Sequence, residues 1–167
     1  MSAITLEAHL ATGAPIAAAP RSIEVGVDAL SIPAGEFTGD FYFAHRIGGS
    51  FWFALGDVAG KGLHAALEMA LIQEEIERII TACASTDPAE VVASLHGAVQ
   101  DELRRNRYAT LVVGRIDGDL RLQIVNAGHC EPYLIGSDER IRAIGAHGPV
   151  VGILPSPKWV LETIELV

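Results

Sequence analysis

One stretch constrains the fold of this chain most, because two apolar runs in it flank a pair of glycines. The runs are Phe41–Ile47 and Phe51–Leu55, and Gly48-Gly49 separates them. Glycine readily adopts the positive φ of a tight turn, so the pattern predicts a β-hairpin. Asp40 and Asp57 each lie eight residues from the nearer glycine. A two-residue loop, or a four-residue loop, therefore places these carboxylates opposite each other on one face of the hairpin.

Two opposed carboxylates need a proton or a cation between them, because side chains in such a pair start only about 4.5–5.5 Å apart and like charges there are destabilising. Oxygen ligands favour a hard ion, Mg²⁺ or Mn²⁺. The glycine-rich continuation after Asp57 lets the backbone bend closely, so the carbonyl of Val58 could be a third ligand. We therefore predict a metal site made by Asp40, Asp57 and Val58. The alternative is that each aspartate merely ends a strand.

The segment Gly56–Gly62 superficially resembles a phosphate-binding loop, with the sequence Gly-Asp-Val-Ala-Gly-Lys-Gly. The nucleotide-binding motif requires four residues between its first two glycines and a Ser or Thr after the lysine. Here only three residues separate Gly56 from Gly60, and Gly62 follows Lys61. The spacing excludes ATP binding by this motif.

Length and charge narrow the class of protein. The chain has 167 residues, which suits one domain, and a formal net charge of −9 with a pI near 5.0. This charge disfavours nucleic acid and anionic membranes as partners. No apolar run reaches the roughly 18 residues that span a bilayer. Cys83 and Cys130 show no metal or redox spacing, and we expect them to be reduced and buried in a cytoplasmic protein.

The rest of the pattern predicts an α+β domain over residues 22–167, preceded by a flexible arm at residues 1–21. Apolar residues recur at helical spacing over 63–83 and 88–106, and the short connection predicts an antiparallel helix pair on a sheet. Alternating apolar residues and turn signals elsewhere predict strands. These are placed at 23–27, 109–116, 120–125, 133–135, 141–144 and 158–167.

Two histidines are candidates for chemistry. His129 follows Asn126-Ala127-Gly128 between two strands and could be a general acid. The more common alternative is a loop histidine whose hydrogen bonds are made by the backbone. His64 is expected to be a surface residue.

Four motifs together resemble the SpoIIE/RsbU-type branch of the PPM metal-dependent serine/threonine phosphatases. They are Gly39–Tyr42, Gly56–Ala66, Asn126–His129 and Gly148–Gly152, in the order found in that family. The resemblance implies an αββα sandwich with two Mg²⁺ or Mn²⁺ ions that activate water for hydrolysis of a phosphoserine or phosphothreonine. By position, Asp40 and Asp57 resemble its first two metal aspartates, with Asp57 bridging the ions and Val58 adding a carbonyl.

Substrates in this branch are typically phosphorylated anti-sigma-factor antagonists in stress or sporulation signalling. The family's Thr-Asp-Gly turn and a later aspartate, which complete its second metal site, have no counterpart up to Val167. We therefore expect a fold incomplete at its C-terminus and weak activity from these 167 residues alone. The alternative function is an inactive phosphatase-like module for binding or oligomerisation. A homodimer is compatible with either function.

Overall fold

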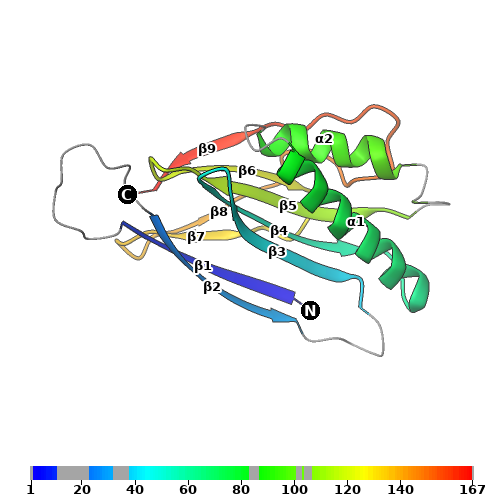
Figure 1. The fold of residues 1–167 in the computed structure, drawn as a ribbon, viewed down its shortest axis with the longest axis horizontal. Coiled ribbons are helices and arrows are strands. Elements are labelled where there is room, and N and C mark those ends of the chain that lie inside the picture. Colours follow the sequence, from blue (N-terminus) through cyan, green and yellow to red (C-terminus); the bar gives the residue numbers. More distant parts are fainter. Residues whose placement is uncertain are drawn as a thin grey trace.

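The structure is a computed structural model that describes residues 2–10, 23–31, 38–82, 87–100, 103 and 107–166. Its centre is a five-stranded antiparallel sheet in the order β3-β4-β5-β6-β9 (Figure 1). These strands are β3 (Asp40–Ile47), β4 (Ser50–Val58), β5 (Ala109–Ile116), β6 (Arg121–Ala127) and β9 (Glu162–Glu165). Two further hairpins are formed by β1 (Ser2–Leu10) with β2 (Ile23–Ser31), and by β7 (Tyr133–Ile135) with β8 (Ile141–Ala143).

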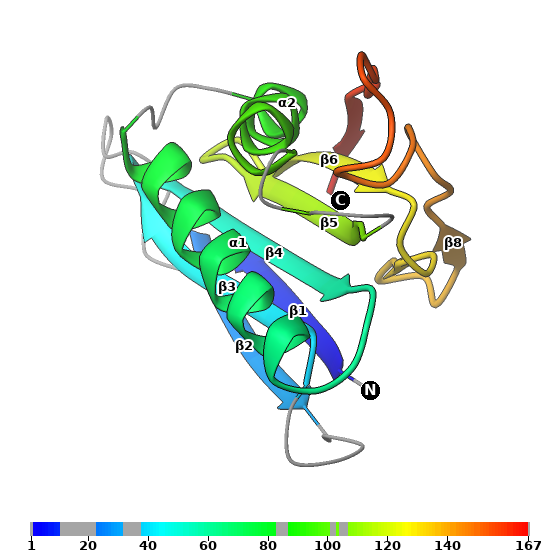
Figure 2. The same ribbon diagram turned by 90° about the vertical axis from the view of Figure 1, so that its right-hand side faces the viewer.

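Two helices, α1 (Leu63–Ala82) and α2 (Pro88–Val99), cover one face of the central sheet, and the small hairpins lie on the other side (Figure 2). Asp87 caps α2, because its carboxylate accepts hydrogen bonds from the amides of Ala89 and Glu90 at 2.8 and 3.0 Å. The predicted α+β class is confirmed. A second helical layer, as in a complete αββα sandwich, is not found among the described residues.

Each face of the central sheet has its own apolar core. Between the sheet and the helices, Trp52, Ile72, Ile76 and Leu95 are fully buried, which explains the isoleucine spacing of α1. The opposite face carries a second cluster that includes Phe51 and contacts residues of β2 and β7. The sheet is therefore an inner layer, and its strands are apolar on both faces.

The β3–β4 hairpin has the predicted two-residue turn. Gly48 and Gly49 adopt φ values of 59° and 83°, which an L-residue adopts only at a cost, and Ile47 pairs with Ser50. This turn fixes the register of the whole hairpin.

Some sequence predictions are wrong. Residues 2–10 of the expected flexible arm form β1, in full register with β2; the alternation of Ile4, Leu6 and Ala8 with polar residues is a strand pattern that outweighs the alanine-rich composition. Residues 11–21 lie outside the described residues. The second helix ends at Val99 rather than near residue 106, although the amide of Leu103 still bonds the carbonyl of Val99 at 2.9 Å. Because this bond keeps Leu103 in the core, the apolar spacing of the sequence continues beyond the last residue of the helix.

The last strand is also shorter than predicted, because only Glu162–Glu165 pairs with β6. Trp159 lies before it and donates a hydrogen bond from Nε1 to the carbonyl of Pro149 at 2.7 Å, so it anchors a loop instead.

Cys130 is exposed, not buried, since it follows β6 in a surface loop, and Cys83 lies outside the described residues. Neither described helix combines the length and apolar character needed to cross a bilayer.

Candidate metal centre

The two aspartates of the hairpin face each other as predicted. Asp40 of β3 is the direct partner of Asp57 of β4. The amide of Val58 donates to the carbonyl of Gly39 at 3.2 Å, so Gly39 and Val58 face each other across a backbone hydrogen bond. In an antiparallel ladder the next pair is then the non-hydrogen-bonded kind, whose Cα atoms are only about 4.5 Å apart and whose side chains are closest. The register places both carboxylates at one end of the sheet.

The electrostatics of this pair favour a positive ligand. Burial raises the pKa of Asp57, the nearby carboxylate of Asp40 raises it further, and His129 acts in the opposite direction. A cation at this position would relieve the repulsion that raises the pKa. The described residues contain no cluster of three or more His, Cys, Asp or Glu side chains suited to a metal ion. Among the described residues, an ion held here would depend on these two carboxylates and on backbone oxygens.

Gly39 leaves a space where oxygen atoms converge. A Cβ atom added to Gly39 would lie 2.6 Å from the carbonyl oxygen of Val58 and 3.0 Å from Oδ1 of Asp57. Both oxygens therefore lie close together beside Gly39, and oxygen is the ligand type that hard cations prefer. The donor set therefore fits Mg²⁺ or Mn²⁺, and it includes the carbonyl that the sequence indicated.

The structure adds two residues to the site that the sequence analysis did not place there. Thr110 of β5 pairs with Asp57 in the sheet, and its hydroxyl lies 3.4 Å from the carbonyl oxygen of Asp57. The same hydroxyl shares a 2.7 Å hydrogen bond with Nδ1 of His129. Burial lowers the pKa of His129, while Asp57 and Asp40 oppose that change. His129 is therefore electrostatically coupled to the aspartate pair through space.

The loop that carries His129 is held by Asn126, which is fully buried at the end of β6. Its side-chain oxygen accepts from the amide of His129 at 2.8 Å, and its side-chain nitrogen donates to the carbonyl of His129 at 3.2 Å and to that of Ile144 at 3.4 Å. Gly128 has a φ of 69°, which suits the sharp bend between Asn126 and His129. The Asn-Ala-Gly-His motif thus fixes the backbone of His129 and brings its ring to the site. The described hydrogen-bond partners of His129 are the side chains of Thr110 and Asn126, not the backbone groups that the more common interpretation expected.

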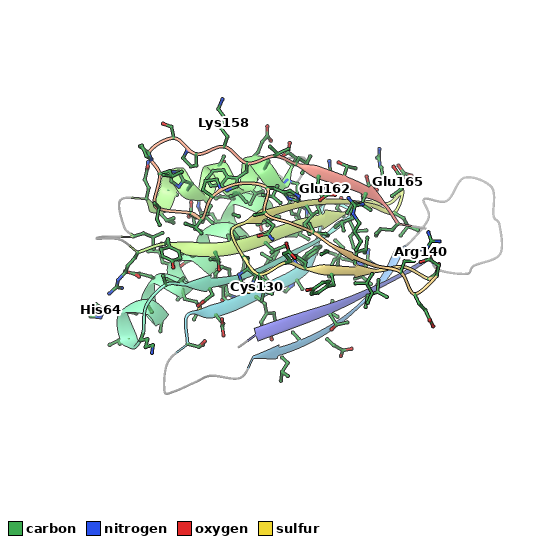
Figure 3. All side chains as sticks on the ribbon, turned by 180° about the vertical axis from the view of Figure 1, so that it is seen from behind. His64, Cys130, Arg140, Lys158, Glu162 and Glu165 are labelled. Carbon is green, nitrogen blue, oxygen red and sulfur yellow. The ribbon has the colours of Figure 1, made fainter. Side chains whose placement is uncertain are left out.

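Other conspicuous residues lie outside the site. His64 is exposed at the first turn of α1, as predicted, and Figure 3 shows it at the edge of the molecule, well away from Cys130. Lys61 is also exposed. Neither side chain has a described contact with the aspartate pair.

We expect Thr110→Val to lower any metal-dependent activity of this site by roughly ten- to a hundredfold, since partners that orient metal ligands have effects of that size. Valine keeps the volume of threonine and removes the hydroxyl that joins Asp57 to His129. The measurement is kcat and Mn²⁺ affinity for the variant and for Thr110→Ser, which keeps the hydroxyl. Restored activity in Thr110→Ser supports the hydroxyl's role, and equal losses in both variants would contradict it.

Comparison with solved structures defines the class of fold. The chain superposes on the PP2C phosphatase domain of the cell-fate determinant SpoIIE from Bacillus subtilis with a TM-score of 0.69 and 16% identity, covering 100% of this chain and 43% of that one. It also matches the structure of RsbX in complex with magnesium, with a TM-score of 0.64 and 16% identity, covering 99% and 69%. The fold is that of the PP2C-type phosphatases.

Sequence comparison then gives the family. Residues 47–167 match the family model described as Stage II sporulation protein E (SpoIIE), and the chain belongs to this family. A curated relative, phosphoserine phosphatase RsbU of Bacillus subtilis strain 168, is 28% identical over 137 residues, which are 80% of this chain. The match spans 40% of the length of RsbU. The chain is thus a SpoIIE-family domain with the PP2C-type fold, and most of its sequence is similar to part of RsbU.

Proposed function

We propose that this domain is a metal-dependent protein serine/threonine phosphatase, with Mg²⁺ or Mn²⁺ held by Asp40, Asp57 and the carbonyl of Val58. The observation that supports the proposal best is the direct cross-strand pairing of the two aspartates beside the space left by Gly39. Family membership supports the reaction class, since the relative RsbU is named a phosphoserine phosphatase. The structure of RsbX in complex with magnesium supports the choice of a hard divalent ion.

Each residue of the site has a distinct part in this proposal. Bound metal would supply Lewis acidity, which activates water and neutralises charge on the phosphoryl group. Asp40 and Asp57 provide the negative charge that attracts and orients the ion. Thr110 contacts Asp57 and His129 and keeps both in place. Because Nδ1 of His129 is engaged by Thr110, Nε2 is the ring nitrogen left to hold or release a proton.

The proposed substrate is a phosphoserine or phosphothreonine on a signalling protein, such as an anti-sigma-factor antagonist in a stress response. The printed name of the relative RsbU, a phosphoserine phosphatase, supports a phosphoprotein substrate. The net charge of −9 disfavours nucleic acid. We propose that the domain acts in the cytoplasm. The proposed function is compatible with a homodimer.

The test is Mn²⁺-dependent phosphate release from an aryl phosphate by the 167-residue chain. Two carboxylates and one carbonyl hold an ion weakly, so we expect slow release that rises with Mn²⁺ into the millimolar range. Fast turnover at micromolar Mn²⁺ would show that further residues complete the site. Complete absence of Mn²⁺-dependent release would contradict the phosphatase proposal.

A binding or oligomerisation module without catalysis is the second candidate. One observation favours it: among the described residues, only these two acidic side chains form the candidate centre. Saturable binding of a phosphoprotein without phosphate release would support this alternative.

A further inference from the structure

The outer edge of β3 is unpaired among the strands that the structure describes. β3 is the terminal strand of the central sheet, and no other strand that the structure describes pairs with its outer side. The Gly39–Val58 hydrogen bond sets the alternation along β3, so that Asp40, Tyr42 and Ala44 direct their backbone groups outward. The first outward amide, that of Asp40, donates to the hydroxyl of Thr38 at 3.1 Å. The next two, of Tyr42 and Ala44, have no described partner in the structure.

A groove follows this edge and includes Asp40, one member of the aspartate pair. Its volume is about 760 Å³, and its lining residues come from β3, from β2 and from α1. Six consecutive residues of β3, 40–45, line the groove. Successive residues of a strand point to opposite faces of the sheet, so a groove that they all line must run along the edge of the strand. Asp40 is therefore both a candidate metal ligand and part of the groove wall.

The groove is acidic. Asp28 of β2, Asp40 of β3 and Glu77 of α1 contribute carboxylates, and no Lys or Arg is among the described lining residues. The other lining residues are neutral or apolar, apart from His45: they are Val27, Ala29, Phe41, Tyr42, Phe43, Ala44, Met69 and Gln73. An extended segment with basic side chains complements this charge, and its alternate residues could contact the apolar wall.

We propose that β3 binds an extended, basic segment of the phosphoprotein substrate by strand addition, which delivers the phosphorylated side chain to Asp40 and Asp57. This inference rests on the proposed phosphatase function for its substrate. Backbone hydrogen bonds to Tyr42 and Ala44 supply affinity that is independent of sequence, while Asp28 and Glu77 select for basic residues. The segment lies along the strand, so its phosphoresidue meets the site only at the Asp40 end.

The test uses synthetic nine-residue phosphoserine peptides with lysine flanks, labelled for fluorescence anisotropy. A second peptide carries N-methyl groups on two backbone amides on one edge of the extended peptide, a third carries them on the opposite edge, and a fourth has glutamate flanks. We expect methylation of the edge that faces β3 to weaken binding about tenfold, because each lost hydrogen bond costs a factor of a few. The glutamate peptide should bind more weakly than the lysine peptide, and the difference should shrink with salt.

Two protein variants complete the experiment. Ala44→Pro removes one outward amide without removing a β3–β4 hydrogen bond, whereas Ala44→Ser keeps that amide. We expect Ala44→Pro to lower peptide affinity several-fold relative to Ala44→Ser, with thermal melting as the check on folding. Equal affinity for all methylated and unmethylated peptides would overturn the proposal. Binding is measured without turnover, so an absence of phosphate release would count against the phosphatase function and leave this test intact.

Discussion

Asp57→Asn is expected to abolish Mn²⁺-dependent phosphate release, with a loss of a hundredfold or more. The substitution keeps the size of the side chain and removes the charge opposite Asp40. Electrostatic stabilisation by a bound ion is worth several kcal/mol, and each 1.36 kcal/mol corresponds to about tenfold in rate. The measurement is the initial rate of phosphate release against Mn²⁺ concentration for the wild type and the variant.

Asp119→Asn is the matched control, since it makes the same change in net charge on an exposed turn side chain. It should keep the wild-type dependence on Mn²⁺. Thermal melting separates metal binding from folding. Mn²⁺ should raise the melting temperature of the wild type and of Asp119→Asn, because a ligand that binds only the folded state stabilises it, and should not raise that of Asp57→Asn. Equal Mn²⁺ responses in Asp57→Asn and the wild type would exclude Asp57 as a ligand.

The same variant has a defined pH signature without metal. Burial and then Asp40 raise the pKa of Asp57 in the folded state above its ordinary value of 3.8. The folded state therefore binds more protons than the unfolded state in this range, and stability falls as the pH rises from 3.8 through the raised pKa. Asp57→Asn should lack this contribution and be at least as stable as the wild type at neutral pH in EDTA.

The aspartate pair could be predicted from the sequence because a local turn controls its register. Gly48 and Gly49 permit only a short loop of defined twist, and every pair along the hairpin follows from that loop. The proximity of Asp40 and Asp57 is therefore local information, although seventeen positions separate them.

The place of His129 could not be predicted in the same way. Its proximity to Asp57 depends on the pairing of β4 with β5, and the chain between these strands includes both helices. No turn connects Asp57 to Thr110, so no local signal gives their register. The motif Asn126–His129 was visible, but only the folded sheet shows that Thr110 links its histidine to the aspartate pair.

The ends of helices and the N-terminal strand were difficult to predict from the sequence for a different reason. Apolar spacing correctly placed Leu103 in the core, yet a residue can be buried just beyond a helix, and no Gly or Pro follows Val99 to indicate the helix end. Composition misled the prediction at residues 2–10, where alanine content suggested an arm and the partner strand β2 supplies the pairing. Tertiary contacts decide both cases.

Gly39→Ala should weaken Mn²⁺ binding more than about tenfold, although the change adds one methyl group. The new Cβ would lie 2.6 Å from the carbonyl oxygen of Val58, a backbone atom that cannot rotate away as a side chain can. Val58 is itself fully buried, and its amide bonds the carbonyl of Gly39. The methyl group must therefore displace the two oxygens or occupy the space between them, and overpacking of this kind also costs about 1–3 kcal/mol of stability.

Gly97→Ala is the control that isolates this effect from a general response to glycine substitution. Gly97 lies within α2, and a Cβ added there meets no atom within 4 Å. Alanine is favoured over glycine in a helix by about 1 kcal/mol, so this variant should melt higher and bind Mn²⁺ as the wild type does. The decisive quantity is the Mn²⁺ dissociation constant from a calorimetric titration at a temperature where both variants are folded. An unchanged constant in Gly39→Ala would mean that the oxygens of Val58 and Asp57 do not share an ion, because the methyl group would then occupy their common space without effect.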